Sequence, residues 1–293
     1  MKKYCLFLLA LSFTLLSGCS NNDDTDDGTP TPQNVDKTGN RLDTGVSGGD
    51  FLSNQNFTKL LIEIGYVQGF RPSDAAIDDL VSFIRAHTFK ETIDVVFTEL
   101  ASPNEEDLTL NEIATLENDN RTAYNDEDTL ATYIYFADAP SEDDDEEEGL
   151  VTLGAVYRNT SMVIHEVTAR RLAARDPRIS NTDVESATLN HEFGHLFGLV
   201  NLGTDPVNDH EDPSAPNHCN VEGCLMRAEL QFDVSGKAIL NGLKENSHKL
   251  RSACSLKGET VLKLLRNKDR KTNKAAPDLD PECVLDLENN GGR

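Results

Sequence analysis

The stretch ISNTDVESATLNHEFGHLFGLVN, residues 179–201, decides the fold that we expect of this chain. Thr182 is followed three residues later by Glu185, a capping-box pattern that predicts the start of a helix. Helical spacing then places His191 and His195 one turn apart on the same face of that helix. Two imidazoles arranged in this way can bind one metal ion. The stretch therefore predicts a helix that carries part of a metal site.

The residues around these two histidines leave the third ligand of such a site open. Glu192 can take a proton from water without itself being a ligand. Gly198 can end the helix in a left-handed conformation and turn the chain back. Asn201 follows, but its neutral amide oxygen is a poor ligand for zinc. His210 and His218 are the two histidines within reach of a returning loop.

Two motifs in this region resemble a known family of zinc enzymes. Residues 191–198 resemble the metzincin signature HExxHxxG, and HCNVEGCLM, residues 218–226, matches the archaemetzincin pattern HCxxxxCxM. The resemblance implies an α/β, zincin-like (metzincin) fold, a mixed twisted sheet with an active-site helix and a Met-turn. It also implies a zinc-dependent metalloendopeptidase with one catalytic zinc ion. The residues that match the family's functional positions are the zinc ligands His191, His195 and His218, the general base Glu192 and the Met-turn residue Met226.

The third ligand departs from the family pattern in its spacing. In archaemetzincins the histidine comes three residues after the glycine, whereas His218 comes twenty residues after Gly198. We interpret residues 201–217 as a loop inserted at Asn201, and closing the longer loop costs only ~1–2 kcal/mol more by the logarithmic law. His210, inside this loop, and an acidic side chain of the loop remain alternative third ligands. Calcium binding by the acidic loop is a weaker alternative to solvated charge.

The cysteines also depart from the family pattern. Archaemetzincins carry a later Cys-x-x-Cys pair, which this chain lacks; Cys254 and Cys283 follow Cys219 and Cys224 as single residues instead. This difference puts the family's second, cysteine-bound zinc in doubt. An even number of cysteines in an exported protein favours two disulfides, with three pairings open. A structural zinc held by the four thiolates is the alternative.

The N-terminal sequence is typical of an exported lipoprotein. MKKYCLFLLALSFTLLSGCS, residues 1–20, has two lysines and an apolar run that is too short for a membrane span. Its LSGC letters resemble the bacterial lipobox, so we predict that residues 1–18 are a signal peptide and that Cys19 is lipidated. Two or three acyl chains at one residue give stable anchoring. The acidic segment that follows resembles the sorting signal of surface-exposed lipoproteins in Bacteroidetes-type bacteria, which predicts an outer-membrane anchor in the cell envelope.

Charge restricts the partners of the mature chain. Without Lys2 and Lys3 the chain has 25 basic and 51 acidic residues, a net charge of −26. Nucleic acid and anionic lipid headgroups are therefore disfavoured as partners. The expected partner is a peptide or protein substrate, and the membrane is reached only through the N-terminal lipid. The sequence leaves the oligomeric state open.

Composition divides the mature chain into a tether and one domain. Residues 19–50 hold few large apolar side chains and many Asp, Asn, Gly, Thr and Pro, which predicts a flexible acidic tether. Residues 51–293 are enough for one metallopeptidase domain with a buried core. The hydrophobic patterns predict strands at 59–67, 92–100 and 129–139 that alternate with helices at 74–87 and 107–118. This alternation predicts an α/β layer.

Residues 150–167 predict two short strands that are separated at Asn159 and Thr160. In a zinc peptidase of this layout, one of these strands lies at the sheet edge, where an extended peptide adds by backbone pairing. Tyr157, in the same region, is a candidate for stabilising an oxyanion.

Two alternatives to a peptidase remain at this point. One is a degenerate zincin that binds zinc or peptide without cleaving it, which Asn201 motivates. The other is a surface binding module in which the helix motif is incidental.

Overall fold

The computed structural model describes residues 35–145, 147, 149–228, 255–266 and 277–293. The helices described are η1 (Thr38–Asn40), α1 (Gly48–Leu52), α2 (Asp74–His87), α3 (Leu110–Asn120), α4 (Glu166–Ala173), α5 (Asn181–Leu196), α6 (Gly258–Arg266) and α7 (Pro281–Asn289). The strands described are β1 (Lys59–Val67), β2 (Thr92–Leu100), β3 (Thr129–Ala137), β4 (Leu150–Thr152), β5 (Gly154–Arg158), β6 (Ser161–His165), β7 (Glu211–Asp212), β8 (Ala215–Cys219) and β9 (Ser255–Lys257). None of the helices in these ranges combines the length and the apolar character needed to cross a bilayer.

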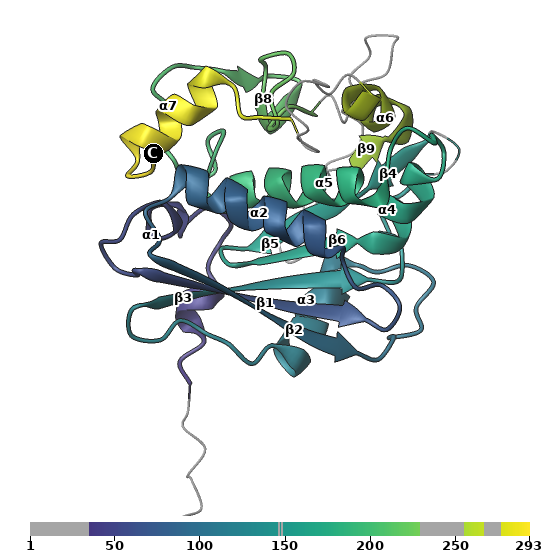
Figure 1. Ribbon diagram of the computed structural model, residues 1–293, viewed down its shortest axis with the longest axis horizontal. Helices are drawn as coiled ribbons and strands as arrows, with labels where there is room; N and C mark the ends of the chain where they lie inside the picture. Colours follow the sequence, from purple (N-terminus) through teal and green to yellow (C-terminus); the bar gives the residue numbers. More distant parts are fainter. Residues whose placement is uncertain (1–34, 146, 148, 229–254, 267–276) are drawn as a thin grey trace, which may run out of the picture. The chain divides into compact units, whose positions relative to one another are not determined.

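Five strands form one mixed sheet in the order β2-β1-β3-β6-β5 (Figure 1). The first four are parallel, and β5 pairs antiparallel with β6 at the edge. Lys59 at the start of β1 lies opposite Thr92 of β2 on one side and Thr129 of β3 on the other. Parallel neighbours need a crossover connection, and α2 and α3 supply the first two. The mixed α/β sheet expected from the sequence is confirmed.

The two faces of the sheet are buried against different helices, because alternate residues of a strand point to opposite sides. Ile62 and Ile64 of β1 pack in one core with Leu80 of α2 and Phe193 of α5. Ile113 of α3 packs in a second core with tyrosines of β3 and β5 on the other face. Figure 1 shows α2 and α5 side by side along the sheet. The helix with the two histidines thus packs against α2 on one side and against β5 and β6 of the sheet.

The N-terminus of α5 is capped by a different pair of residues from the predicted one. Ser180 is the N-cap: its Oγ accepts a hydrogen bond from Asp183 N at 3.2 Å, and Asp183 Oδ2 accepts one from Ser180 N at 2.9 Å. Glu185 instead accepts a hydrogen bond at 3.0 Å from the backbone N of Ser73, at the start of α2. The predicted pair of Thr182 and Glu185 is wrong, because a tertiary partner takes the Glu185 carboxylate.

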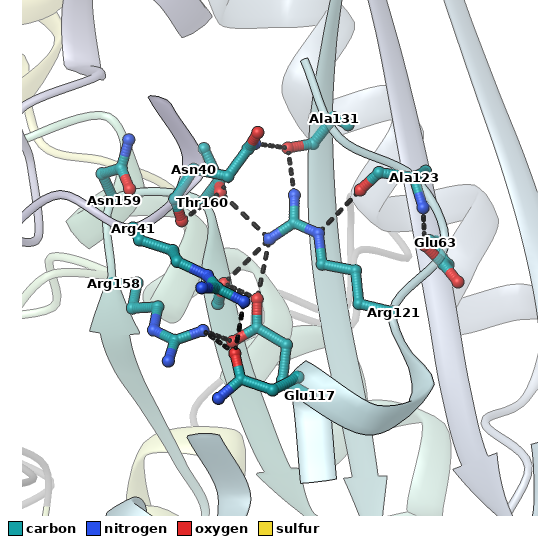
Figure 2. Close-up of polar contacts among 12 residues, drawn as sticks. Asn40, Arg41, Glu63, Glu117, Arg121, Ala123, Ala131, Arg158, Asn159 and Thr160 are labelled. Carbon is teal, nitrogen blue, oxygen red and sulfur yellow. Dashed lines mark hydrogen bonds and ion pairs between the residues drawn. The ribbon is translucent and has the colours of Figure 1, made fainter. Parts of the chain in front are cut away.

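The folded domain begins before the boundary predicted at residue 51. Asn40 is fully buried, and its Nδ2 donates a hydrogen bond to the carbonyl oxygen of Ala131 at 3.0 Å (Figure 2). Leu42 N donates to Asn159 Oδ1 at 2.9 Å, and Asn159 N donates to Leu42 O at 3.0 Å. Residues 35–50 therefore pack onto the sheet although their composition is polar. The predicted signal peptide, the lipidation site and the rest of the tether lie outside the described residues.

A buried ionic network joins α3 to the sheet (Figure 2). Glu117 Oε1 lies 2.8 Å from Arg121 Nη1, and Glu117 Oε2 lies 2.7 Å from Arg158 Nη1. The side chains of Glu117 and Arg121 are 1% and 0% exposed. Arg121 Nη2 also donates to the carbonyl oxygen of Ala131 at 2.8 Å. Buried charges persist only when they are paired and hydrogen-bonded, so this network determines where α3 sits on the sheet.

Replacing Glu117 with alanine should lower the free energy of unfolding by ~3–5 kcal/mol, because it leaves buried positive charge without its carboxylate. The ion pair of Lys59 and Asp128 offers a matched control, since its side chains are 50% and 47% exposed. Lys59→Ala should therefore change the free energy of unfolding by less than ~1 kcal/mol. Urea unfolding followed by circular dichroism measures both variants, and equal losses would contradict the assigned role of the network.

Candidate metal centre

Two elements that are distant in the sequence bring three histidines together. His191 and His195 come from α5 and His218 comes from β8, and one ring nitrogen of each lies within 4.8 Å of the others. The Nε2 atoms of His191 and His195 are 3.2 Å apart. The three side chains are buried. The structure therefore gathers the three histidines that the family resemblance implies for one zinc ion.

Backbone carbonyl groups orient two of these imidazoles. His191 Nδ1 lies 2.8 Å from the carbonyl oxygen of Leu225, and His218 Nδ1 lies 3.0 Å from that of Pro216. A carbonyl oxygen only accepts, so each Nδ1 carries the hydrogen and donates it. Each Nε2 then presents its lone pair, which is the arrangement that a metal-binding histidine requires. The donor set fits a zinc ion.

Burial keeps the three imidazoles neutral. It lowers the pKa of His191 to about 3, with a further contribution from the nearby His218. Burial lowers the pKa of His195 well below its usual value, and His191 and His218 lower it further. The pKa of His218 is also lowered by burial. Because histidine binds metal as the neutral imidazole, the cluster can accept a metal ion at neutral pH without first losing protons.

Met226 packs against α5 at the position between the two histidines of that helix. A Cβ atom on Gly194 would lie 2.2 Å from Met226 Sδ, so only glycine leaves room for the methionine. Met226 O also accepts a hydrogen bond from Cys219 N at 2.8 Å, at the end of β8. The methionine that the family resemblance implies thus lies under the histidine-bearing helix and is joined to the strand that carries His218.

Glu192 is buried where α5 meets β5. A Cβ atom on Gly154, the first residue of β5, would lie 2.8 Å from Glu192 Cγ and 3.1 Å from Glu192 Oε1. The backbone of Gly154 is not in the left-handed region, so this position needs glycine for space. The carboxylate of Glu192 therefore lies beside the edge strand of the sheet.

The chain leaves α5 through a turn that carries Asn201 away from the histidines. Gly198 has a φ of +81° and its N donates to His195 O at 3.0 Å, which ends the helix as predicted. Val200 and Asn201 follow with φ values of 55° and 67°. Asn201 Nδ2 then donates to Glu211 Oε2 at 2.6 Å. Asn201 thus belongs to the loop between α5 and β8 and contacts Glu211 there.

His210, the alternative third ligand, lies in a second cluster with Cys219, Asp280 and Cys283. His210 Nε2 is 2.7 Å from Asp286 Oδ2, and His210 Nδ1 is 3.3 Å from Cys219 Sγ. Both ring nitrogens of His210 are therefore engaged away from the three-histidine cluster.

The described cysteines do not form the expected disulfides. Cys219, Cys224 and Cys283 are all buried free thiols, and Cys254 lies outside the described residues. Cys224 Sγ and Cys283 Sγ are 3.7 Å apart, compared with about 2.05 Å in a disulfide. Cys219 Sγ donates instead to Asp280 Oδ2 at 3.1 Å. The disulfide expectation is corrected for these three residues, because the fold groups them with a histidine and a carboxylate.

Strand β5 lies at the sheet edge, as expected, but Tyr157 does not face the histidines. Gly154 contacts Glu192 on the α5 side of the sheet, and Tyr157, three residues on, packs in the opposite core with Tyr133. Strand alternation separates the two faces. Tyr157 is buried in that core on the face of the sheet away from the histidines, so its expected role with an oxyanion is wrong.

Several residues that shape the site gave no signal in the sequence. The carbonyl oxygens of Leu225 and Pro216 act through the backbone, which any residue supplies. Gly154 is one of many glycines, and nothing around it marks a close approach. Asp286 lies far along the chain from its partner His210. Only a three-dimensional structure could assign these roles.

Comparison with known proteins finds similarity at the level of solved structures. No protein-family profile matches the chain, and no curated protein sequence matches it. The structure of archaemetzincin from Methanopyrus kandleri is 14% identical, with a TM-score of 0.43 over 80% of this chain and 95% of that chain. The structure of metalloproteinase-II from Bacteroides fragilis is 13% identical, with a TM-score of 0.32 over 66% of this chain and 52% of that chain.

The contact between Gly194 and Met226 predicts that a methyl group added at residue 194 destabilises the fold. Gly194→Ala should lower the free energy of unfolding by ~1–3 kcal/mol, since the core is already filled by the Met226 thioether. Gly49 in α1 is a matched control, because no atom lies within 4 Å of the position of its Cβ. Gly49→Ala should be neutral or stabilising. Thermal unfolding of both variants tests the contact, and a harmless Gly194→Ala change would argue against it.

The lowered pKa values predict how the metal-free protein responds to acid. Histidines of the unfolded chain bind protons near pH 6.5, whereas the pKa of His191 is about 3 in the fold because of burial. The unfolded state therefore binds more protons as the pH falls below about 6.5, and stability falls with it, by up to ~1.4 kcal/mol per pH unit for each such histidine. Chemical unfolding in a chelator between pH 7 and pH 5 should show a steeper loss for the parent protein than for His191→Asn. If both proteins lost stability equally between pH 7 and pH 5, the result would contradict the burial of His191 in its neutral form.

Proposed function

We propose that the chain is a zinc-dependent metalloendopeptidase that hydrolyses peptide bonds in peptide or protein substrates. The observation that carries this proposal is the convergence of three buried, neutral imidazoles beside a buried carboxylate on the same helix. His191, His195 and His218 would hold the zinc ion. When bound, zinc supplies Lewis acidity, which polarises a carbonyl group and acidifies water. Three protein ligands are the number typical of catalytic zinc sites.

Glu192 is the residue that moves the proton in this proposal. It follows His191 directly on α5, so its carboxylate stays beside the cluster without using the face that carries the imidazoles. A carboxylate in this place accepts a proton from the attacking water and returns it to the amine that leaves. Contact with Gly154 restricts the Glu192 side chain to this part of the site. The chain thus supplies a positioned general base.

Strand β5 gives the site a place for an extended substrate. It pairs with β6 on one side only, so its other side ends the five-stranded sheet. A peptide added along a sheet edge binds through main-chain hydrogen bonds. Because β5 begins at Gly154, against Glu192, such a peptide would pass beside the proposed base.

The N-terminal residues support a proposal about location. LSGC at residues 16–19 follows an apolar run, which favours cleavage before Cys19 and its lipidation. The enzyme would then be tethered to the outer membrane of the cell envelope by lipid. Metabolic labelling with a fatty acid should mark the parent protein, and a Cys19→Ala variant that is labelled equally would contradict the assignment.

Replacing Glu192 with glutamine is the sharpest test of the peptidase proposal. The variant should keep its zinc and lose ~10²–10⁴-fold in kcat, because glutamine cannot accept the proton from water. Cleavage of a mixture of denatured proteins by the parent should stop with a chelator and return with zinc. Undiminished cleavage by Glu192→Gln would exclude this residue as the base.

Two further variants separate the proposed enzyme from a degenerate relative. His218→Ala should lose the catalytic zinc, since two imidazoles remain, whereas Asn201→Ala should keep it because Asn201 contacts Glu211 instead. Metal analysis of the purified proteins measures both. A parent protein with an empty three-histidine cluster would favour the degenerate alternative, and cleavage that is insensitive to chelator would rule out zinc catalysis.

A further inference from the structure

Strand β2 forms the edge of the sheet opposite to β5 (Figure 1). Within the described residues it pairs with β1 on one side, and no strand pairs with its other side. β2 is long, because Thr92–Leu100 pairs with β1 over nine residues without a register shift. A free strand edge presents a row of backbone N–H and C=O groups that can pair with another chain. The outer side of β2 is therefore a place where a further strand can add.

Every second residue of β2 directs its backbone groups to this outer side. The carbonyl oxygen of Leu100 accepts a hydrogen bond from Gln68 N at 3.1 Å, on the side of β1. Backbone groups alternate in direction along a strand, so the residues at even positions bond to β1. The residues that present their N–H and C=O groups to the outer side are Ile93, Val95, Phe97 and Glu99.

β2 lacks the features that usually keep edge strands from pairing. Native sheets protect their edges with short strands, proline, lysine or a bulge. β5, at the other edge, has five residues and a register shift between Val156 and Arg158. β2 has none of these features, since TIDVVFTEL contains neither proline nor lysine. Its Val96 and Phe97 are 44% and 37% exposed, so the strand offers an apolar surface for pairing.

The sequence of β2 is complementary to itself in the antiparallel register that uses its whole length. The residues opposed in this register are Thr92 with Leu100, Ile93 with Glu99, Asp94 with Thr98, Val95 with Phe97, and Val96 with Val96 of the second copy. Neither Asp94 nor Glu99 then faces another charge. The pair of Val95 and Phe97 occurs twice, and a β-branched residue opposite an aromatic one is a favourable cross-strand pair. The partner that this edge fits is therefore a second copy of the same strand.

We propose that two copies of this chain associate through β2, about a two-fold axis at Val96. A two-fold interface of identical surfaces is the commonest arrangement in protein oligomers. The sheet order β2-β1-β3-β6-β5 then continues from one copy into the other through the two β2 strands. Both β5 strands remain at the far ends of the joined sheet, so the association leaves the proposed substrate edges open.

The charge of the chain determines how this association depends on salt. The net charge is −24, so two copies repel each other at long range. Salt screens this repulsion, whereas β2 pairing itself places no charge opposite another. Raising the salt concentration should therefore lower the dissociation constant of the dimer.

Charged side chains at the two-fold axis test the proposed register. Val96→Lys and Val96→Glu each place like charges opposite each other, so each should raise the dissociation constant at least ~10-fold. An equal mixture of the two variants places opposite charges there and should associate again. Val207→Lys is the matched control and should behave like the parent, because Val207 is 45% exposed and lies outside β2. Sedimentation equilibrium of the full-length protein in excess detergent measures all four samples.

The proposal is overturned by a parent that stays monomeric at high salt, or by a mixture of the two charge variants that stays monomeric.

Cross-linking gives a second measurement that does not depend on affinity. Residues at even positions bond to β1, so Val96 and its copy form a non-hydrogen-bonded pair with Cα atoms about 4.5 Å apart. A disulfide can span this separation. Mild oxidation of Val96→Cys should therefore give a covalent dimer that a reductant separates, whereas Val207→Cys should give no more dimer than the parent. Equal cross-linking of the two variants, or none at residue 96, would refute pairing through β2.

Discussion

Helix α5 is buried along almost its whole length, and some of its polar side chains have hydrogen-bond partners on neighbouring elements. Glu185 accepts from Ser73 of α2, and His191 donates to the carbonyl oxygen of Leu225. A buried polar group without a partner costs ~1–3 kcal/mol, so each of these contacts restricts the position of a neighbour. The start of α2 and the segment after β8 are both restricted in this way. The proposed metal centre depends on the same constraint, because burial keeps its imidazoles neutral.

Two glycines make this burial compatible with the chemistry. Gly194 lets Met226 reach α5 between the histidines, and Gly154 lets Glu192 lie against β5. Neither has a positive φ, so each is needed for the missing side chain and not for its backbone freedom. This close approach restricts the Met226 and Glu192 side chains to defined positions before a metal ion binds. The close packing at these two glycines therefore also preorganises the side chains of the site.

Local patterns predicted the first half of the domain closely. The ranges expected for β1, α2 and β2 coincide with the observed elements, because continuous apolar runs and helical periodicity are properties of adjacent residues. Prediction failed where a distant partner changed the outcome. Residues 35–50 are polar yet ordered, since Asn40 and Leu42 bond to residues of the sheet and its connections. Glu185 matches a capping box, but Ser73 is its partner.

The sequence by itself determined the two-histidine helix, the glutamate beside it and the glycine that ends it, because about two turns of one helix set all of these positions. Only the tertiary structure decided which later histidine joins them and what the cysteines do. His210 and His218 are equally available along the chain, but strand β8 turns His218 toward α5 and Cys219 toward α7. The reason is physical: distances between remote residues depend on strand register and on which face a side chain occupies, and neither can be read from spacing in the sequence.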